Sequence, residues 1–191
     1  RHTRLVSNWS SDVCSSDLGA GTEVPIWLLG SSLFSAQLAA ERGLPYAFAS
    51  HFAPRLLGQA LDVYRSRFRP SAVLSAPHAV VGVPVIAAPD DDEAELLASS
   101  VYQRVYGILT GRRGRLPPPQ ADFMAQLHPG DRAAIHDFLA AAVIGGPEKI
   151  REGFTRLVER TAADELMLVC DIYDPALRLR ALDIVSAACG R

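Results

Sequence analysis

The sequence has no hydrophobic run that approaches the roughly 20 residues needed to cross a membrane, and we therefore expect no membrane association. It also lacks a basic stripe. The 191 residues carry a net charge of -2, which argues against a general nucleic-acid-binding protein. At 49% hydrophobic residues, the chain is too apolar for a disordered tail and long enough for one domain with a sizeable core.

Cysteine and lysine are scarce. Cys14, Cys170 and Cys189 are too widely spaced for a disulfide framework or a zinc site. We expect isolated, mostly buried thiols in a cytoplasmic protein. Lys149 is the only lysine and falls in a predicted helix, which argues against a barrel lyase that forms a Schiff base at a strand end.

Several catalytic patterns are absent as well. The sequence contains neither a Ser-His-Asp pattern nor a glycine-rich dinucleotide fingerprint. The histidines have no cysteine or carboxylate partner at metal-binding spacing, and we expect no metal site.

Residues 1–18 differ in texture from the rest of the chain. They are serine-rich, follow neither a strand period nor a helix period, and resemble translated adapter or vector sequence. We expect a non-native segment there, and we assign the domain to residues 22–191.

Residues 25–45 are typical of a strand, a tight turn and a helix. Residues 26–29 are all apolar, as expected for a strand buried on both faces. The turn 30–32 breaks this run, apolar residues return at helical spacing from Leu33, and Gly43 is suited to end the helix. A helix start presents free N–H groups and a positive dipole end, which suit a phosphate. Serines are also common helix caps, and taken alone they favour capping.

Short apolar runs alternate with helical patterns along the rest of the chain. This alternation predicts parallel βαβ units and an α/β fold with four parallel strands, at residues 26–29, 46–50, 79–87 and 166–170. Pro84 lies within the third run and indicates a bulge or an edge position there, because proline cannot donate to a strand ladder.

Helices are expected between the third and fourth strands. The patterns place them at residues 94–109, 133–143 and 149–160, with a turn at 145–148. The acidic cluster Asp90–Glu93 could bind a metal. Its position just before the first of these helices favours helix capping instead.

Two blocks of residues resemble the luciferase-like, flavin-dependent monooxygenases. The first combines Pro25–Ser32, Ser35–Ala36 and Gly43–Phe52, and the second combines Gly145–Glu148 with Ala163–Leu168. The likeness extends from about Thr22 to Ser186. Members of this family are complete (β/α)₈ barrels. The resemblance therefore implies the C-terminal half of such a TIM barrel, from its fifth strand onward.

The resemblance also implies which residues bind the cofactor. In this family the phosphate of reduced FMN lies at the start of the helix after the fifth strand. Carried over by position, Ser32 and Ser35 match the hydroxyl residues that contact the phosphate. Leu33 would contribute its backbone N–H, and Gly30 and Ser31 would shape the turn.

The end of the next strand is implied to face the substrate. Ser50, His51 and Phe52 end the sixth strand of the implied barrel, at the face where barrel chemistry occurs. No catalytic residue is assigned. His51 is the one candidate, and it could contact flavin or substrate or be a half-exposed loop histidine. Phe52 could wall off the flavin ring, and Tyr173 could line the mouth.

The family implies an enzyme that oxygenates a small organic substrate with reduced FMN and molecular oxygen. A flavin reductase could supply the reduced flavin, NAD(P)H could be a direct reductant, and the intact protein is expected to be a homodimer. F420 in place of FMN is one alternative, and a non-enzymatic flavin- or phosphate-binding half-barrel is another. We expect the half-barrel alone to be inactive, and the sequence does not specify the substrate.

Overall fold

The computed structural model describes residues 24–190, and the segment 1–18 that we expect to be non-native lies outside this range. Five strands of the described chain form one parallel sheet: β1 (Leu28–Gly30), β2 (Tyr46–Ala49), β3 (Ala79–Ala87), β4 (Val143–Gly145) and β5 (Glu165–Val169). The predicted α/β class is confirmed, and so are the four predicted strands.

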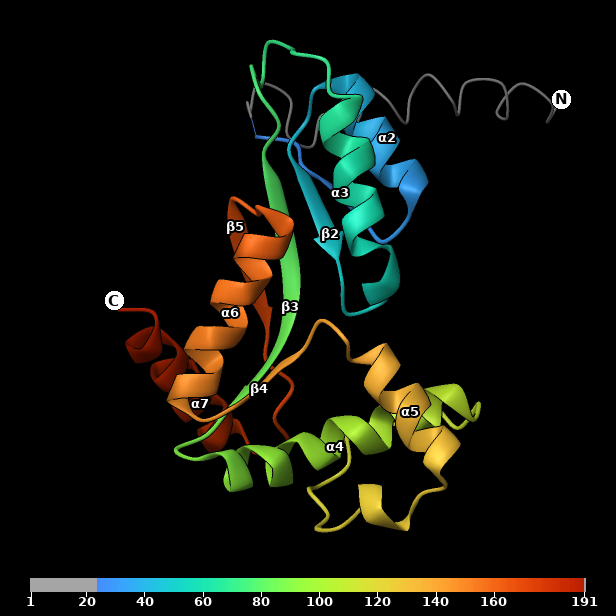
Figure 1. The fold of residues 1–191 in the computed structure, drawn as a ribbon, viewed down its shortest axis with the longest axis vertical. Coiled ribbons are helices and arrows are strands. Elements are labelled where there is room, and N and C mark those ends of the chain that lie inside the picture. Colours follow the sequence, from blue (N-terminus) through green and yellow to red (C-terminus); the bar gives the residue numbers. More distant parts are fainter. Residues whose placement is uncertain (1–23, 191) are drawn as a thin grey trace, which may run out of the picture.

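Helices connect these strands, as Figure 1 shows. They are α2 (Leu33–Arg42), α3 (Leu57–Ser66), α4 (Asp91–Leu109), α5 (Pro129–Phe138), α6 (Pro147–Thr161) and α7 (Pro175–Ala188), with short 3₁₀ turns at Pro54–Leu56 and Met124–Gln126.

Two helix ends form as the sequence predicts. Helix α2 ends at Gly43, which adopts the left-handed conformation at φ 60°. Helix α4 is capped by Asp90, whose carboxylate accepts a 2.8 Å hydrogen bond from the N–H of Glu93. The capping role expected for the acidic cluster is therefore confirmed.

Strand β3 is the centre of the sheet. It pairs with β2 over residues 79–82, with β5 over residues 80–84 and with β4 over residues 85–87. In Figure 1 it runs along the molecule from α2 and α3 toward α4 and α5. Its near-continuous burial matches the unbroken apolar sequence of a central parallel strand.

Pro84 occupies a local edge of this central strand. Pairing with β2 stops at Gly82 and pairing with β4 begins at Val85, so Val83 and Pro84 pair only with β5. One side of the strand has no partner strand at this point, and the missing N–H of proline is tolerated there. Of the two expected positions, a bulge or an edge, the structure has the edge.

The predicted helix 133–143 is wrong at its end. Helix α5 stops at Phe138, and Val143–Gly145 forms the short strand β4 instead. The apolar run before Gly145 is too short to show a strand period, and periodicity alone does not separate such a run from a buried helix end.

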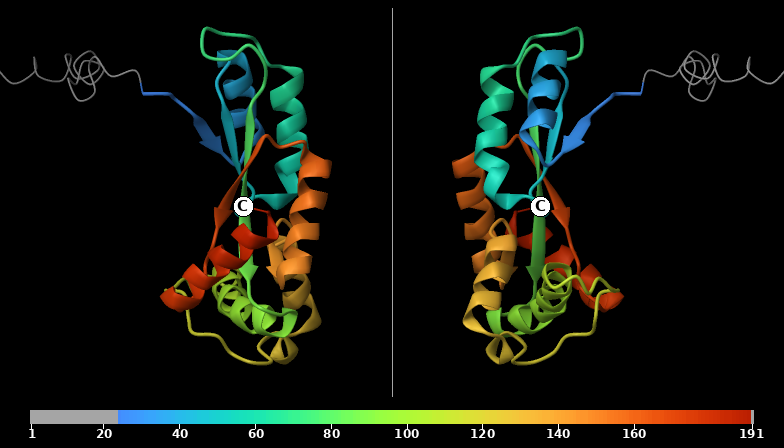
Figure 2. Two further views of the ribbon diagram at one scale, coloured as in Figure 1. Left: turned by 90° about the vertical axis from the view of Figure 1, so that its left-hand side faces the viewer. Right: turned by 90° about the vertical axis from the view of Figure 1, so that its right-hand side faces the viewer.

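The two faces of the sheet differ in exposure. Helix α2 packs against α3, α3 against α6, and α6 against α7. In Figure 2, α3 and α6 lie on one side of the central strand β3, and the edge strands β1 and β5 lie on the other. Tyr46 and Phe48 of β2 are fully buried. On the edge strands, by contrast, Leu29 is 70% exposed and Met167 is 62% exposed.

The burial expected for residues 26–29 on both faces is therefore wrong for this chain. Leu29 lies in register with Ala47 of β2, and Met167 lies in register with Gly82 of β3. In-register neighbours in a parallel sheet share a face, and this face has no layer of helices over its edge strands. A sheet with helices on one face and open edge strands matches one half of a barrel.

Two of the cysteines are more exposed than expected, and Cys14 lies outside the described residues. Cys189 is exposed and Cys170 is half-buried, where burial raises the pKa of its thiol. Within residues 24–190, no helix combines the length and the apolar character that a membrane span needs.

The contact between α6 and β4 gives a test of the fold. A Cβ atom at Gly153 would lie 2.5 Å from Cγ1 of Val143. The variant Gly153→Ala should therefore lower the free energy of unfolding by about 1–3 kcal/mol through overpacking. Gly58 in α3 has no heavy atom within 4 Å of such a Cβ. Gly58→Ala should therefore raise stability by about 0.5–1 kcal/mol. Urea unfolding of both variants checks the pair, and equal effects would contradict this packing.

Candidate functional site

The parallel sheet gathers the predicted site residues at one edge. Because every described strand pair is parallel, the carboxyl ends of the strands point the same way. The turn after β1 carries Ser31 and Ser32, and the turn after β2 carries His51 and Phe52. Ligands of open and closed α/β folds bind at this edge.

The start of α2 is closed by a reciprocal pair of serines. The Oγ of Ser32 accepts a hydrogen bond from the N–H of Ser35 at 3.2 Å, and the Oγ of Ser35 accepts one from the N–H of Ser32 at 3.4 Å. The Oγ of Ser35 also lies 2.7 Å from the carbonyl oxygen of Ser32, to which it donates. These contacts form a capping box.

Two further residues shape this turn. A Cβ atom at Gly30 would lie 2.2 Å from the Oγ of Ser35, so the absence of a side chain at position 30 lets the serine fold against the strand. The phenol oxygen of Tyr46, on β2, lies 3.0 Å from the same Oγ. Burial raises the pKa of Tyr46, and the hydrogen bond with Ser35 opposes this shift only in part. The phenol of Tyr46 therefore stays neutral.

The capping box leaves donors available for a ligand. A helix start has four N–H groups without partners inside the helix, and the box satisfies those of Ser32 and Ser35. The two that remain belong to Leu33 and Phe34. No acidic residue lies in the first turn of α2, and the helix dipole there is therefore free to favour an anion.

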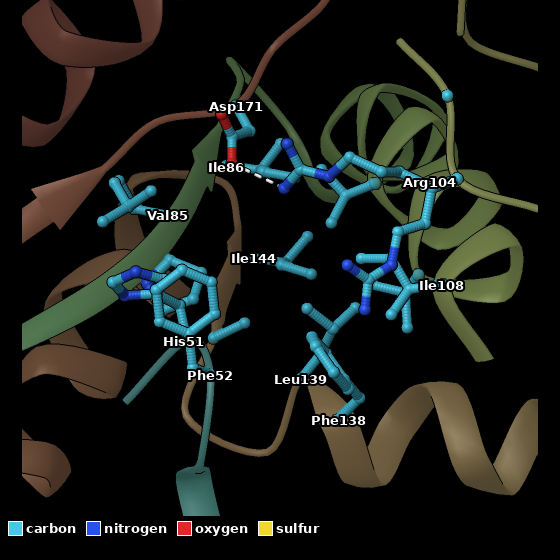
Figure 3. Close-up of a pocket in the computed structure, with 17 residues that line it drawn as sticks. His51, Phe52, Val85, Ile86, Arg104, Ile108, Phe138, Leu139, Ile144 and Asp171 are labelled. Carbon is cyan, nitrogen blue, oxygen red and sulfur yellow. Dashed lines mark hydrogen bonds and ion pairs between the residues drawn. The ribbon is translucent and has the colours of Figure 1, made fainter. Parts of the chain in front are cut away.

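A second feature is a pocket of about 600 Å³ at the carboxyl ends of β2, β3 and β5, closed by α4 and the segment that follows it. Figure 3 shows its walls. They are mainly apolar and come from residues far apart in sequence: Phe52, Pro84, Val85, Ile86, Val101, Val105, Ile108, Phe138, Leu139, Ala142, Ile144 and Val169. Its volume is typical of a site for a small organic molecule.

His51 lies in the wall of this pocket. Its Nδ1 would be 3.3 Å from a Cβ atom at Gly82, so the glycine lets the imidazole lie against β3. This nitrogen is buried and has no hydrogen-bond partner in the described chain. The ring centroid lies 4.2 Å from that of Phe52, and both rings lie on the same side of the pocket in Figure 3.

An ion pair crosses one end of the pocket. Nη2 of Arg104, on α4, lies 2.7 Å from Oδ2 of Asp171, which directly follows Cys170 at the end of β5. In Figure 3 the two side chains point toward one another. Both side chains are about one-third exposed, and the pair ties the long helix to the last strand.

Two of the predicted pocket residues lie elsewhere. Ser50 is fully buried, and its Oγ donates to the carbonyl oxygen of Gly82, which joins the end of β2 to β3. Tyr173 is 48% exposed in the loop before α7 and does not line the pocket. Among the predicted substrate residues, the structure places His51 and Phe52 in the pocket.

Sequence reasoning missed Arg104, Arg113 and Asp171, which supply most of the charge of the pocket. Arg113 belongs to the basic loop Gly111–Arg115, which follows α4. Asp171 directly follows the predicted fourth strand, and this position at a strand end was the available signal.

Residues 8–165 match the family model for luciferase-like monooxygenases. The chain belongs to this family. It is 43% identical over 168 residues to the uncharacterized protein YvbT of Bacillus subtilis (strain 168), with 88% of this chain and 50% of that protein covered. It is also 43% identical over 166 residues to a luciferase-like monooxygenase of Escherichia coli (strain K12), with 87% and 50% covered.

The chain thus spans about half the length of these curated relatives. Its fold is similar to the crystal structure of apo-MsnO8, with a TM-score of 0.72 and 30% identity over 86% of this chain and 50% of that chain. The predicted family and the half-barrel fold are confirmed.

Two more distant structures share the fold alone. The oxygenating constituent of 3,6-diketocamphane monooxygenase from Pseudomonas putida, in complex with FMN, has a TM-score of 0.57 at 21% identity, with 85% of this chain and 47% of that chain covered. The coenzyme F420-dependent tetrahydromethanopterin reductase from Methanopyrus kandleri has a TM-score of 0.55 at 15% identity, with 86% and 50% covered.

The environment of His51 predicts a pH dependence of stability. Burial lowers its pKa, the Asp171 carboxylate opposes this shift, and the Arg104 guanidinium adds to it. Below about pH 6.5, the ordinary pKa of histidine, the unfolded chain gains a proton that the folded chain takes up only at lower pH. The free energy of unfolding should therefore fall as the pH drops from about 6.5 through the folded pKa.

The variant His51→Gln should lose less stability over that pH interval than the unmodified chain does. Urea unfolding at a series of pH values measures the difference, with His136→Gln on α5 as the control for removing one histidine. A pH profile that His51→Gln leaves unchanged would show that the imidazole is not held neutral by burial.

Proposed function

We propose that the intact protein is an FMN-dependent monooxygenase that uses reduced flavin and molecular oxygen to oxygenate a small organic substrate. One observation carries this proposal. The sheet edge that presents the donor-rich start of α2 also presents an apolar pocket of about 600 Å³. Membership of the luciferase-like family and the FMN complex of a protein of this fold support it.

The residues at the start of α2 fit a phosphate. The N–H groups of Leu33 and Phe34 are without partners inside the helix. Ser32 and Ser35 are three positions apart in the sequence, and their Oγ atoms lie 3.3 Å from each other. Gly30 leaves the space that Ser35 occupies. These residues would hold the FMN phosphate, and Ser31 would help to shape the turn.

The chain would contribute binding, orientation and the exclusion of water. When bound, reduced FMN would supply the electrons that activate oxygen. The apolar walls of the pocket would keep water from the reacting groups. His51 would meet flavin or substrate as a neutral imidazole, because burial disfavours its charged form.

The cofactor and the partners carry alternatives. The F420-dependent reductase shares the fold, and F420 in place of FMN is therefore the second candidate.

We propose a homodimer and a separate flavin reductase as partners of the intact protein, with NAD(P)H as the alternative direct reductant. A non-enzymatic half-barrel would bind flavin without consuming oxygen, which an oxygen electrode measures directly.

The phosphate site can be tested with Ser32→Ala/Ser35→Ala in the full-length protein. A hydrogen bond to a charged group contributes about 1.5–3 kcal/mol. Each hydroxyl already has a partner within the chain, so we expect the lower part of this range. FMN binding should weaken by roughly tenfold to a hundredfold. Riboflavin, which has no phosphate, should bind nearly as before. Fluorescence quenching measures both affinities, and F420 is titrated in parallel.

Loss of helix capping gives a different result. The double variant also removes the cap of α2, which costs about 1 kcal/mol of stability. Asp174→Ala removes the cap of α7, where the carboxylate accepts from the N–H groups of Ala176 and Leu177. If the serine variant changes the affinities for FMN and riboflavin by equal factors, as the Asp174 variant is expected to do, the serines act only as caps. The phosphate site then lies elsewhere.

A further inference from the structure

The charges around the apolar pocket are unequal. Four of its lining residues carry titratable groups: His51, Arg104, Arg113 and Asp171. Arg104 and Asp171 are joined by their 2.7 Å ion pair, so their charges offset one another. Burial favours the neutral form of His51. Arg113 is left as the one cation of the lining without a counter-charge among these four groups.

Arg113 is placed to meet a ligand. It lies in the loop after α4 and lines the pocket, and no hydrogen bond or ion pair joins its side chain to another residue in the described range 24–190. Its neighbour Arg112 is engaged, because its guanidinium lies 5.7 Å from the ring centroid of Tyr106. Arg115 lines a separate groove and does not line this pocket.

We propose that this pocket binds a small organic monoanion, an acid with an apolar body and one carboxylate. The body would pack against Ile144 and Phe138, and the guanidinium of Arg113 would bind the carboxylate. A planar guanidinium matches a carboxylate with two parallel hydrogen bonds. Burial of the apolar body against the walls of the pocket would add to the binding free energy. This assignment rests on the proposed function, since it names the substrate class of the same site.

The test compares two ligands of the same shape, naphthylacetate and naphthylacetamide, which differ in charge. Isothermal titration of the full-length protein without flavin measures their dissociation constants. Naphthylacetate should bind about tenfold more tightly, as expected for a hydrogen-bonded charge. Added salt should weaken the binding of naphthylacetate and leave that of naphthylacetamide nearly unchanged.

Variants of the basic loop identify the residue. Arg113→Ala should remove the preference for naphthylacetate, and Arg113→Lys should retain part of it. Arg115→Ala removes the same charge from the same loop without altering the pocket lining and should leave the preference intact. Equal affinity for the two ligands in the unmodified protein overturns the proposal. So does an equal loss of preference in Arg113→Ala and Arg115→Ala.

The result is independent of the cofactor. The titration contains no flavin and needs no turnover, and Ser32→Ala/Ser35→Ala should bind naphthylacetate as the unmodified protein does. Weak FMN binding together with a normal preference for the acid would count against the monooxygenase and leave the acid site standing. Tight FMN binding without that preference would overturn the acid site and leave the monooxygenase proposal standing.

Discussion

The backbone ladder along β3 holds the described chain together. This strand pairs in parallel with β2, β5 and β4 at successive positions, and its nine residues extend beyond β2 toward α4. Because all of these pairs are parallel, the loops after β2, β3 and β5 open at one edge. The length of β3 beyond β2 gives the pocket a wall that includes Pro84, Val85 and Ile86. The position of the pocket therefore follows from which strands β3 can pair with.

The sequence predicted most of this framework because its signals are local. Gly43 and Asp90 end and begin helices through contacts within a few residues, and such signals can be read directly from a chain. Strand β4 could not be read in this way. Val143 is held by the packing of α6 and by pairing with Val85, and neither contact is local.

The two parts of the candidate site differ in how far the sequence indicated them. The turn from Gly30 to Ser35 is one continuous stretch of the chain, and the resemblance to a known family includes Gly30–Ser32 and Ser35. The pocket is different, because Arg104 and Asp171 are 67 positions apart and meet only once the sheet has formed. Exposure was misjudged for a related reason. Leu29 and Met167 are apolar, and no local pattern states whether a second layer covers them.

The mutual hydrogen bonds of Ser32 and Ser35 have a consequence for how a cofactor could come and go. A ligand that bonds to these hydroxyls replaces hydrogen bonds that the two serines make within the chain when the ligand is absent, so its departure leaves neither hydroxyl unpaired. The two hydroxyls are therefore hydrogen-bonded with or without the ligand, and only the N–H groups of Leu33 and Phe34 lose a partner when it leaves. A ligand held in this way can be exchanged without rearrangement of the serine turn, because the fold does not depend on it.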